Sequence, residues 1–153
     1  MILSDLDILE CIKSGDIVID PFDSSAVKPG TYRFTLNDVL LRPKAVAELD
    51  AQSGEPEYDT IQIPTEGFVI RPGEFYLGQT KETLSISTKL CCVLDARSSL
   101  ARIGLNVLQG SMFVEPGQQK SHETLEISNI GPSPICVHAG MQIVRGYFVL
   151  LQT

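Results

Sequence analysis

Two arginines and two serines lie within six residues of each other, in the segment from Arg97 to Arg102. The segment predicts a short helical turn near residues 97–103, on which Ser98 and Arg102 share a face because they are four positions apart. Guanidinium groups, hydroxyls and the free amides at the start of a helix are groups that bind phosphate. The segment therefore fits a phosphate cradle. It fits equally well a connecting helix, capped by Ser98 or Ser99, whose arginines pair with nearby carboxylates.

Two glutamates are candidates for chemistry. In the run from Thr124 to Ser128, alternation places Leu125 and Ile127 on one face of a strand and Glu126 on the other. Periodicity alone favours a solvated Glu126 over a carboxylate that lines a pocket. Glu115 stands where a strand runs into the turn at Pro116-Gly117. A carboxylate at such a position is most often a turn residue without a catalytic role.

The cysteines give no sign of a metal centre. Cys11, Cys91, Cys92 and Cys136 form no Cys-x-x-Cys pair, and none has a histidine at zinc-ligand spacing, so no zinc site is expected. Adjacent Cys91 and Cys92 would point to opposite faces of a strand, and we interpret them as apolar core residues in a reducing compartment. The first residues carry acids where a signal peptide needs bases, which predicts a cytoplasmic protein.

The elements that must position these groups are mostly strands. Ser4 is typical of a helix N-cap, and a partly apolar stripe predicts a helix of about ten residues that ends before Gly15. Short β-branched or aromatic runs follow, separated by turn dipeptides such as Pro29-Gly30, Pro72-Gly73 and Pro116-Gly117. These turns are too closely spaced for strand-helix-strand units. The sequence therefore predicts an all-β fold, a sandwich or jelly-roll-like barrel.

Length and charge narrow the possible partners. The 153 residues, 43% of them hydrophobic, suit one folded domain that spans residues 1–153, and the apolar residues are too evenly spread for a membrane span. A formal charge of -7 disfavours nucleic-acid binding, so any phosphate must be held by a local cluster of arginine, lysine or metal. The polar stretch 45–64 is expected to be a surface loop or a floppy hairpin without chemistry.

Four motifs follow one another along the chain: Arg97-Ser98-Ser99-Leu100-Ala101-Arg102-Ile103-Gly104-Leu105, Glu115-Pro116-Gly117, Thr124-Leu125-Glu126-Ile127, and Ala139-Gly140-Met141. Their order resembles the dCTP deaminase branch of the dUTPase-like superfamily over nearly the whole chain. The arginine-serine block is shared by the deaminase and dUTPase branches, whereas the Leu-Glu pair leans towards the deaminases. The resemblance implies a distorted jelly roll of the dUTPase-like type, and a homotrimer with active sites between subunits.

The resemblance also implies roles for individual residues. It assigns a deaminase that converts dCTP to dUTP without zinc, with Glu126 as the catalytic acid and base. Ser98, Arg102 and a backbone carbonyl near Ser111 would position the water and the transition-state charge. A Mg²⁺ ion would arrive on the triphosphate. The residues expected to bind the nucleotide are Arg97, Ser99, Ser111, Glu115 and Gln142.

Some positions depart from the family pattern. The deaminases usually carry a His- and Thr-containing strand where this chain has residues 106–113. Arg33 and Arg145 stand where the family favours Asp and Gln. Two alternatives therefore stay open. One is a dUTP diphosphatase, alone or combined with deamination, and the other is a non-catalytic trimeric nucleotide-binding protein.

Overall fold

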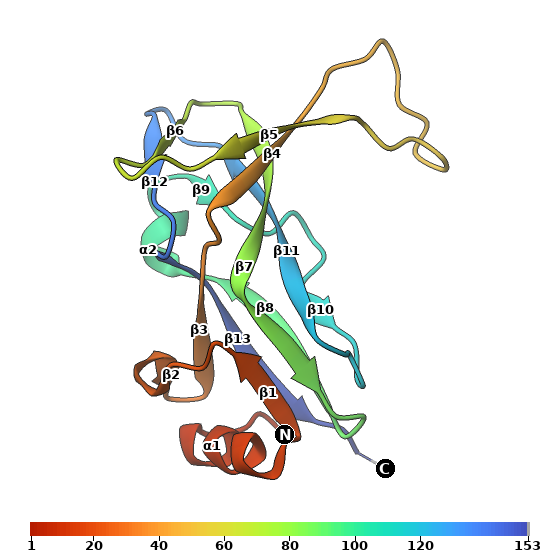
Figure 1. Ribbon diagram of the computed structural model, residues 1–153, viewed down its shortest axis with the longest axis vertical. Helices are drawn as coiled ribbons and strands as arrows, with labels where there is room; N and C mark the ends of the chain where they lie inside the picture. Colours follow the sequence, from red (N-terminus) through yellow and green to blue (C-terminus); the bar gives the residue numbers. More distant parts are fainter. Residues whose placement is uncertain (153) are drawn as a thin grey trace.

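Two β-sheets that enclose one hydrophobic core form most of the protein (Figure 1). The computed structural model describes residues 1–152, and Thr153, the last residue of the expected domain, lies outside them. The elements in chain order are α1 (Asp5–Ser14), β1 (Ile17–Asp20), the 3-10 turn η1 (Ser24–Ala26), β2 (Val27–Lys28), β3 (Thr31–Thr35), β4 (Val39–Pro43), β5 (Tyr58–Gln62), β6 (Phe68–Ile70), β7 (Phe75–Ile86), β8 (Leu90–Ala96), α2 (Ser98–Ala101), β9 (Leu105–Asn106), β10 (Phe113–Val114), β11 (Ser121–Asn129), β12 (Ile135–Val137) and β13 (Gln142–Leu150).

The strands form antiparallel ladders. The first sheet has the order β5-β4-β7-β11-β9, with β1 also paired to β7, and the second has the order β10-β8-β13-β3-β2. A separate two-stranded ladder joins β12 to β6. Buried residues alternate with less buried ones along β3, β7 and β11, because one face of each strand packs on the core. The largest fully buried side chains, which include Tyr32, Phe34, Tyr76 and Phe148, come from both sheets. The expected all-β fold is confirmed.

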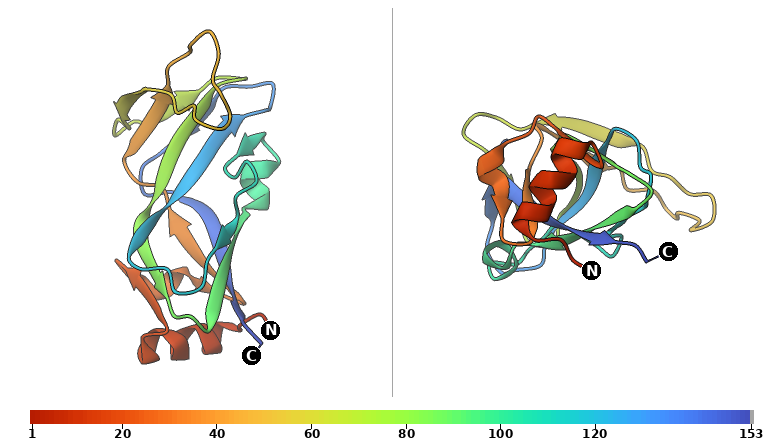
Figure 2. Two further views of the ribbon diagram at one scale, coloured as in Figure 1. Left: turned by 90° about the vertical axis from the view of Figure 1, so that its right-hand side faces the viewer. Right: turned by 90° about the horizontal axis from the view of Figure 1, so that it is seen from below.

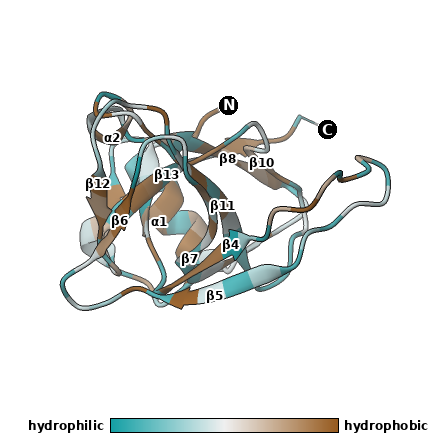
Figure 3. Cartoon of the chain, turned by 90° about the horizontal axis from the view of Figure 1, so that it is seen from above, coloured by the Kyte–Doolittle hydropathy of each residue, from teal (hydrophilic) through white to brown (hydrophobic). Residues whose placement is uncertain are grey.

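Helix α1 closes one end of the sandwich, as Figure 2 shows from below. Ser4 and Asp7 form a reciprocal capping box at its start, and Gly15 ends it with a left-handed φ of 81°. Ile8 is fully buried against the core, whereas the outer face carries polar side chains together with the exposed Leu6, and the mixed colouring of the helix is visible in Figure 3. The predicted ten-residue helix is confirmed.

Of the two expectations for the polar stretch, the hairpin is confirmed: residues 58–62 form strand β5, which pairs antiparallel with β4, while the preceding part of the stretch projects from the sandwich (Figure 1). The structure corrects one local expectation. Helix α2 is only four residues long. Its N-cap is Arg97, and no side chain caps its amides, so the prediction that Ser98 or Ser99 caps this helix is wrong. Among residues 1–152, no helix is long and apolar enough to cross a membrane.

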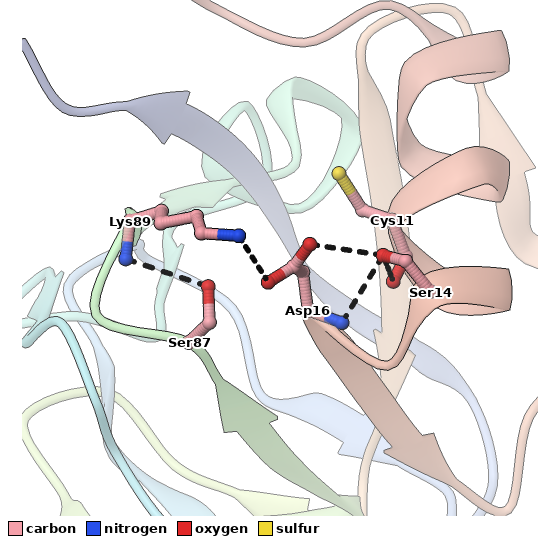
Figure 4. A network of polar contacts seen from close by, with 5 residues as sticks. All are labelled: Cys11, Ser14, Asp16, Ser87 and Lys89. Carbon is pink, nitrogen blue, oxygen red and sulfur yellow. Dashed lines mark hydrogen bonds and ion pairs between the residues drawn. The ribbon is translucent and has the colours of Figure 1, made fainter.

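A polar network fastens the end of α1 to the turn between β7 and β8 (Figure 4). Ser14 Oγ donates to Asp16 Oδ2 over 2.9 Å, and Lys89 Nζ lies 3.7 Å from Asp16 Oδ1. The backbone N–H of Ser87 donates to the Asp16 carbonyl over 2.8 Å. Hydrogen bonding from Ser14 is the main reason why the pKa of Asp16 is lowered from its ordinary value. The ionised Asp16 therefore stabilises this corner of the fold.

The Asp16→Asn substitution is expected to lower the melting temperature at pH 7. Because the pKa of Asp16 is lowered in the folded state, its contribution is fully present above the ordinary carboxyl pKa of about 3.9 and is lost as pH falls through the folded-state value. The melting temperatures of the unmodified protein and of Asp16→Asn should therefore converge as pH falls. Differential scanning calorimetry of both proteins between pH 7 and pH 2 measures them. The exposed Asp38→Asn variant is the control. A deficit in Asp16→Asn that persists unchanged at low pH would contradict the electrostatic explanation.

Candidate active site

Glu126 lies in the middle of β11, on the outer face of the first sheet. Its neighbours Leu125 and Ile127 are fully buried in the core, so alternation turns the Glu126 side chain away from it. Glu126 is nevertheless half-buried, and its Oε2 accepts a hydrogen bond from the backbone N–H of Gln109 over 3.3 Å. The Glu126 side chain is therefore partly covered by the loop after β9 and partly open to solvent.

That loop is fixed by residues that sequence reasoning did not single out. Asn106 pairs with Ser128 on β11, and its Nδ2 donates to Gln109 Oε1 over 3.1 Å. The Asn106 Oδ1 also accepts from the backbone N–H of Leu108 over 3.5 Å, and Leu108 is buried. These contacts hold the Gln109 amide towards Glu126. The sequence signal that could have indicated this loop was Asn106 itself, because an asparagine side chain commonly forms a hydrogen bond with the backbone two residues further along the chain.

A shallow cavity adjoins Glu126 on the same face. Its volume is about 200 Å³, and its lining includes Leu77, which is the register partner of Glu126, and Thr124, two residues before it. The remaining lining residues are Val39, Leu41, Gly78 and Gln79. Ser111 is exposed on the loop that carries Gln109. A carboxylate, a backbone amide and a partly apolar hollow therefore meet on the outer face of the first sheet.

A second cavity, which we term the arginine pocket, has a volume of about 240 Å³ and is lined by Arg33, Arg97, Ser98, Ser99 and Arg145. Gln142 supports it from β13. Arg97 Nη1 donates to the Gln142 carbonyl over 2.9 Å, and Arg33 Nη1 donates to Gln142 Oε1 over 3.2 Å. The structure thus gathers three of the expected nucleotide-binding residues, Arg97, Ser99 and Gln142, around groups that can bind phosphate.

Arg102 and Glu115 line neither the arginine pocket nor the hollow beside Glu126. Arg102 is exposed beyond the end of α2 and lines a cavity of about 720 Å³ between residues 101–104 and residues 130–136. The Arg102 N–H donates to the Ser98 carbonyl over 3.0 Å, so the two residues are one helical turn apart, as predicted, but their side chains line different cavities. Glu115 is exposed in the turn after β10. Within residues 1–152, no hydrogen bond or ion pair joins Glu126 to residues 97–102.

The groups that could bind an anion are arginines and hydroxyls. In the part of the chain that the structure describes, no three His, Cys, Asp or Glu side chains gather in a way that could hold a metal ion. Cys91 and Cys92 are buried, and desolvation raises the pKa of Cys92 well above its ordinary value. These two cysteines are therefore core residues, as the sequence predicted.

The fold is of the dUTPase-like class. A dCTP deaminase from Agrobacterium tumefaciens superposes on 98% of this chain with a TM-score of 0.76 and 18% identity, and this chain spans 48% of that structure. A mutant dUTPase from phage phi11 of S. aureus superposes on 90% of this chain and is itself covered to 92%, with a TM-score of 0.56 and 12% identity. The expected fold class is confirmed.

Within that class, the sequence model described as dCTP deaminase-like matches residues 2–150, and the chain belongs to this family. A relative from Beutenbergia cavernae, named "dCTP deaminase, dUMP-forming", is 37% identical over an alignment that covers all of this chain and 81% of the relative. A relative of the same name from Rhodococcus opacus is also 37% identical, over 94% of this chain and 77% of its own length.

Replacing Asn106 is expected to loosen the loop that covers Glu126. In Asn106→Ala both side-chain contacts are lost, so residues 106–113 should take up deuterium faster in hydrogen-exchange mass spectrometry. Asn106→Asp keeps the acceptor for Leu108 but loses the donor to Gln109, so its exchange should be intermediate. Exchange unchanged in both variants would show that the buried apolar residues fix the loop unaided.

Proposed function

We propose that this protein deaminates dCTP with Glu126 as acid and base, and that dUMP is the end product. The observation that carries the proposal is the half-buried Glu126 carboxylate, held by the Gln109 amide beside a partly apolar hollow. The arginine pocket supports a phosphate-bearing substrate. The relatives are named as dUMP-forming dCTP deaminases, which supports both the substrate and dUMP instead of the dUTP expected from the sequence.

One carboxyl group can carry every proton of the deamination. Glu126 takes a proton from a water that attacks C4 of the cytosine ring and delivers it to N3, which produces a tetrahedral intermediate. It then moves the second proton from the new hydroxyl to the 4-amino group, which leaves as ammonia. A further water attacks the α-phosphorus and displaces pyrophosphate. The balance is dCTP plus two waters giving dUMP, ammonia and pyrophosphate, and a magnesium ion enters with the triphosphate.

The remaining expected catalytic groups enter the proposal through a second copy of the chain. Ser98 and Arg102 make no contact with Glu126 within residues 1–152 of one chain. Ile103 and Ile130 line the same cavity as Arg102 and are 51% and 77% exposed, which leaves two large apolar side chains facing water at one place. We infer that a neighbouring copy covers this face and that a homotrimer brings Ser98 and Arg102 to the Glu126 of its neighbour.

The Glu126→Gln substitution is expected to reduce ammonia release from dCTP by roughly 10²-fold or more, because the amide cannot accept the proton of water. Binding of dCTP should change far less, since the side chain keeps its shape. Ammonium assay and chromatographic separation of dCTP, dUTP and dUMP, with and without Mg²⁺, measure the effect. Glu48→Gln, in the exposed loop before β5, is the charge-matched control.

Other outcomes would redirect the assignment. Unchanged turnover in Glu126→Gln would remove this residue from the mechanism. Accumulation of dUTP without pyrophosphate would restore dUTP as the end product. Release of pyrophosphate from dUTP, with dCTP left intact, would identify a diphosphatase, and binding of dCTP without conversion would identify a non-catalytic nucleotide-binding protein.

A further inference from the structure

Three charged residues form a row across the second sheet. Asp95 on β8 is the register partner of Arg145 on β13, and Arg145 is in turn the register partner of Arg33 on β3. Register partners in an antiparallel ladder point to the same face of the sheet, with their Cβ atoms about 5 Å apart. Arg33 and Arg145 are therefore like charges held directly opposite each other, an arrangement that destabilises a sheet.

The compensation for these charges is incomplete. Arg145 donates through Nε and Nη2 to Asp95 Oδ2, over 2.9 and 2.5 Å. Arg33 and Arg97 instead contact the neutral side-chain and main-chain oxygens of Gln142. Among residues 1–152, three guanidinium groups thus line one pocket of about 240 Å³ and one carboxylate pairs with them, which leaves two positive charges without an ion pair there, in a chain of net charge -7. Such a concentration of one sign of charge raises the local concentration of anions.

We propose that Arg33 and Arg145 are specificity-determining residues that bind the terminal phosphates of the nucleotide, so that this protein selects nucleoside triphosphates over monophosphates. The inference rests on the proposed function for the identity of the base. A guanidinium has five N–H donors, so Arg145 can bind phosphate while Asp95 still orients it, and Arg33 can do the same beside Gln142. A polyphosphate chain can contact both facing arginines and offset the repulsion between their charges. A single phosphate group carries less negative charge, so part of this repulsion remains.

The first test uses inorganic tripolyphosphate as the probe, in isothermal titration calorimetry at constant ionic strength. Arg33→Gln and Arg145→Gln are each expected to weaken tripolyphosphate binding by roughly tenfold, because each removes a charged hydrogen-bond donor. Arg71→Gln removes the same charge from an exposed turn outside the pocket and should bind as the unmodified protein does. Without ligand, Arg33→Gln should melt no lower than the unmodified protein, because one of two facing like charges is gone.

The second test compares dCTP with dCMP in the unmodified protein and in Arg33→Gln and Arg145→Gln. The dissociation constant of dCMP divided by that of dCTP should fall by roughly tenfold in each variant, because dCTP binding becomes weaker. Tripolyphosphate binding requires no turnover, so its loss in the arginine variants supports the inference even where Glu126→Gln shows that the proposed deamination is wrong. Binding within twofold of the unmodified protein in both arginine variants, or equal weakening in Arg71→Gln, would overturn it.

Discussion

The packing of one face of each strand against a shared core is the constraint on which both candidate sites depend. Leu125 and Ile127 can be buried only if Glu126 points outwards, and a shift of one residue along β11 would exchange them. The same constraint acts on β13, where Val144 and Phe148 are fully buried while Arg145 faces outwards beside its register partners. Hydrophobic burial therefore sets the direction in which the polar side chains point.

Much of this arrangement could be predicted from local sequence. The capping box at Ser4 fixed the start of α1, the alternation around Glu126 fixed its face, and adjacent Cys91 and Cys92 were correctly placed in the core. Local pattern was weaker where structure depends on partners far along the chain. The polar segment Tyr58–Gln62 is a strand because β4 pairs with it. The segment has no hydrophobic alternation that would predict a strand from its sequence.

The two cavities illustrate the same limit at the level of function. Arg33 and Arg145 are 112 positions apart, and only the register between β3 and β13 makes them neighbours. In the same way, the contact between Gln109 and Glu126 requires the β9 to β11 pairing as well as the turn formed by Asn106. The chain carried the residue types needed for a phosphate site in its 97–102 segment. The residues that complete the pocket came from another strand pair and could not be read from spacing.

Strand geometry also decides between two carboxyl groups that are three residues apart on β11. Burial raises the pKa of Glu123 from its ordinary value, and a raised pKa is a common mark of a catalytic acid. Glu123, however, points to the same side as Leu125 and Ile127, and its Oε1 accepts a hydrogen bond from Gln118 beside the core. Neither carboxyl lines a cavity described above, but the hollow is lined by Leu77, the register partner of Glu126. Glu126 has the opposite orientation, beside a hollow and under the loop whose Gln109 backbone N–H donates to it. Access to a substrate, rather than the size of a pKa shift, is therefore the reason why we propose Glu126 for the proton transfer.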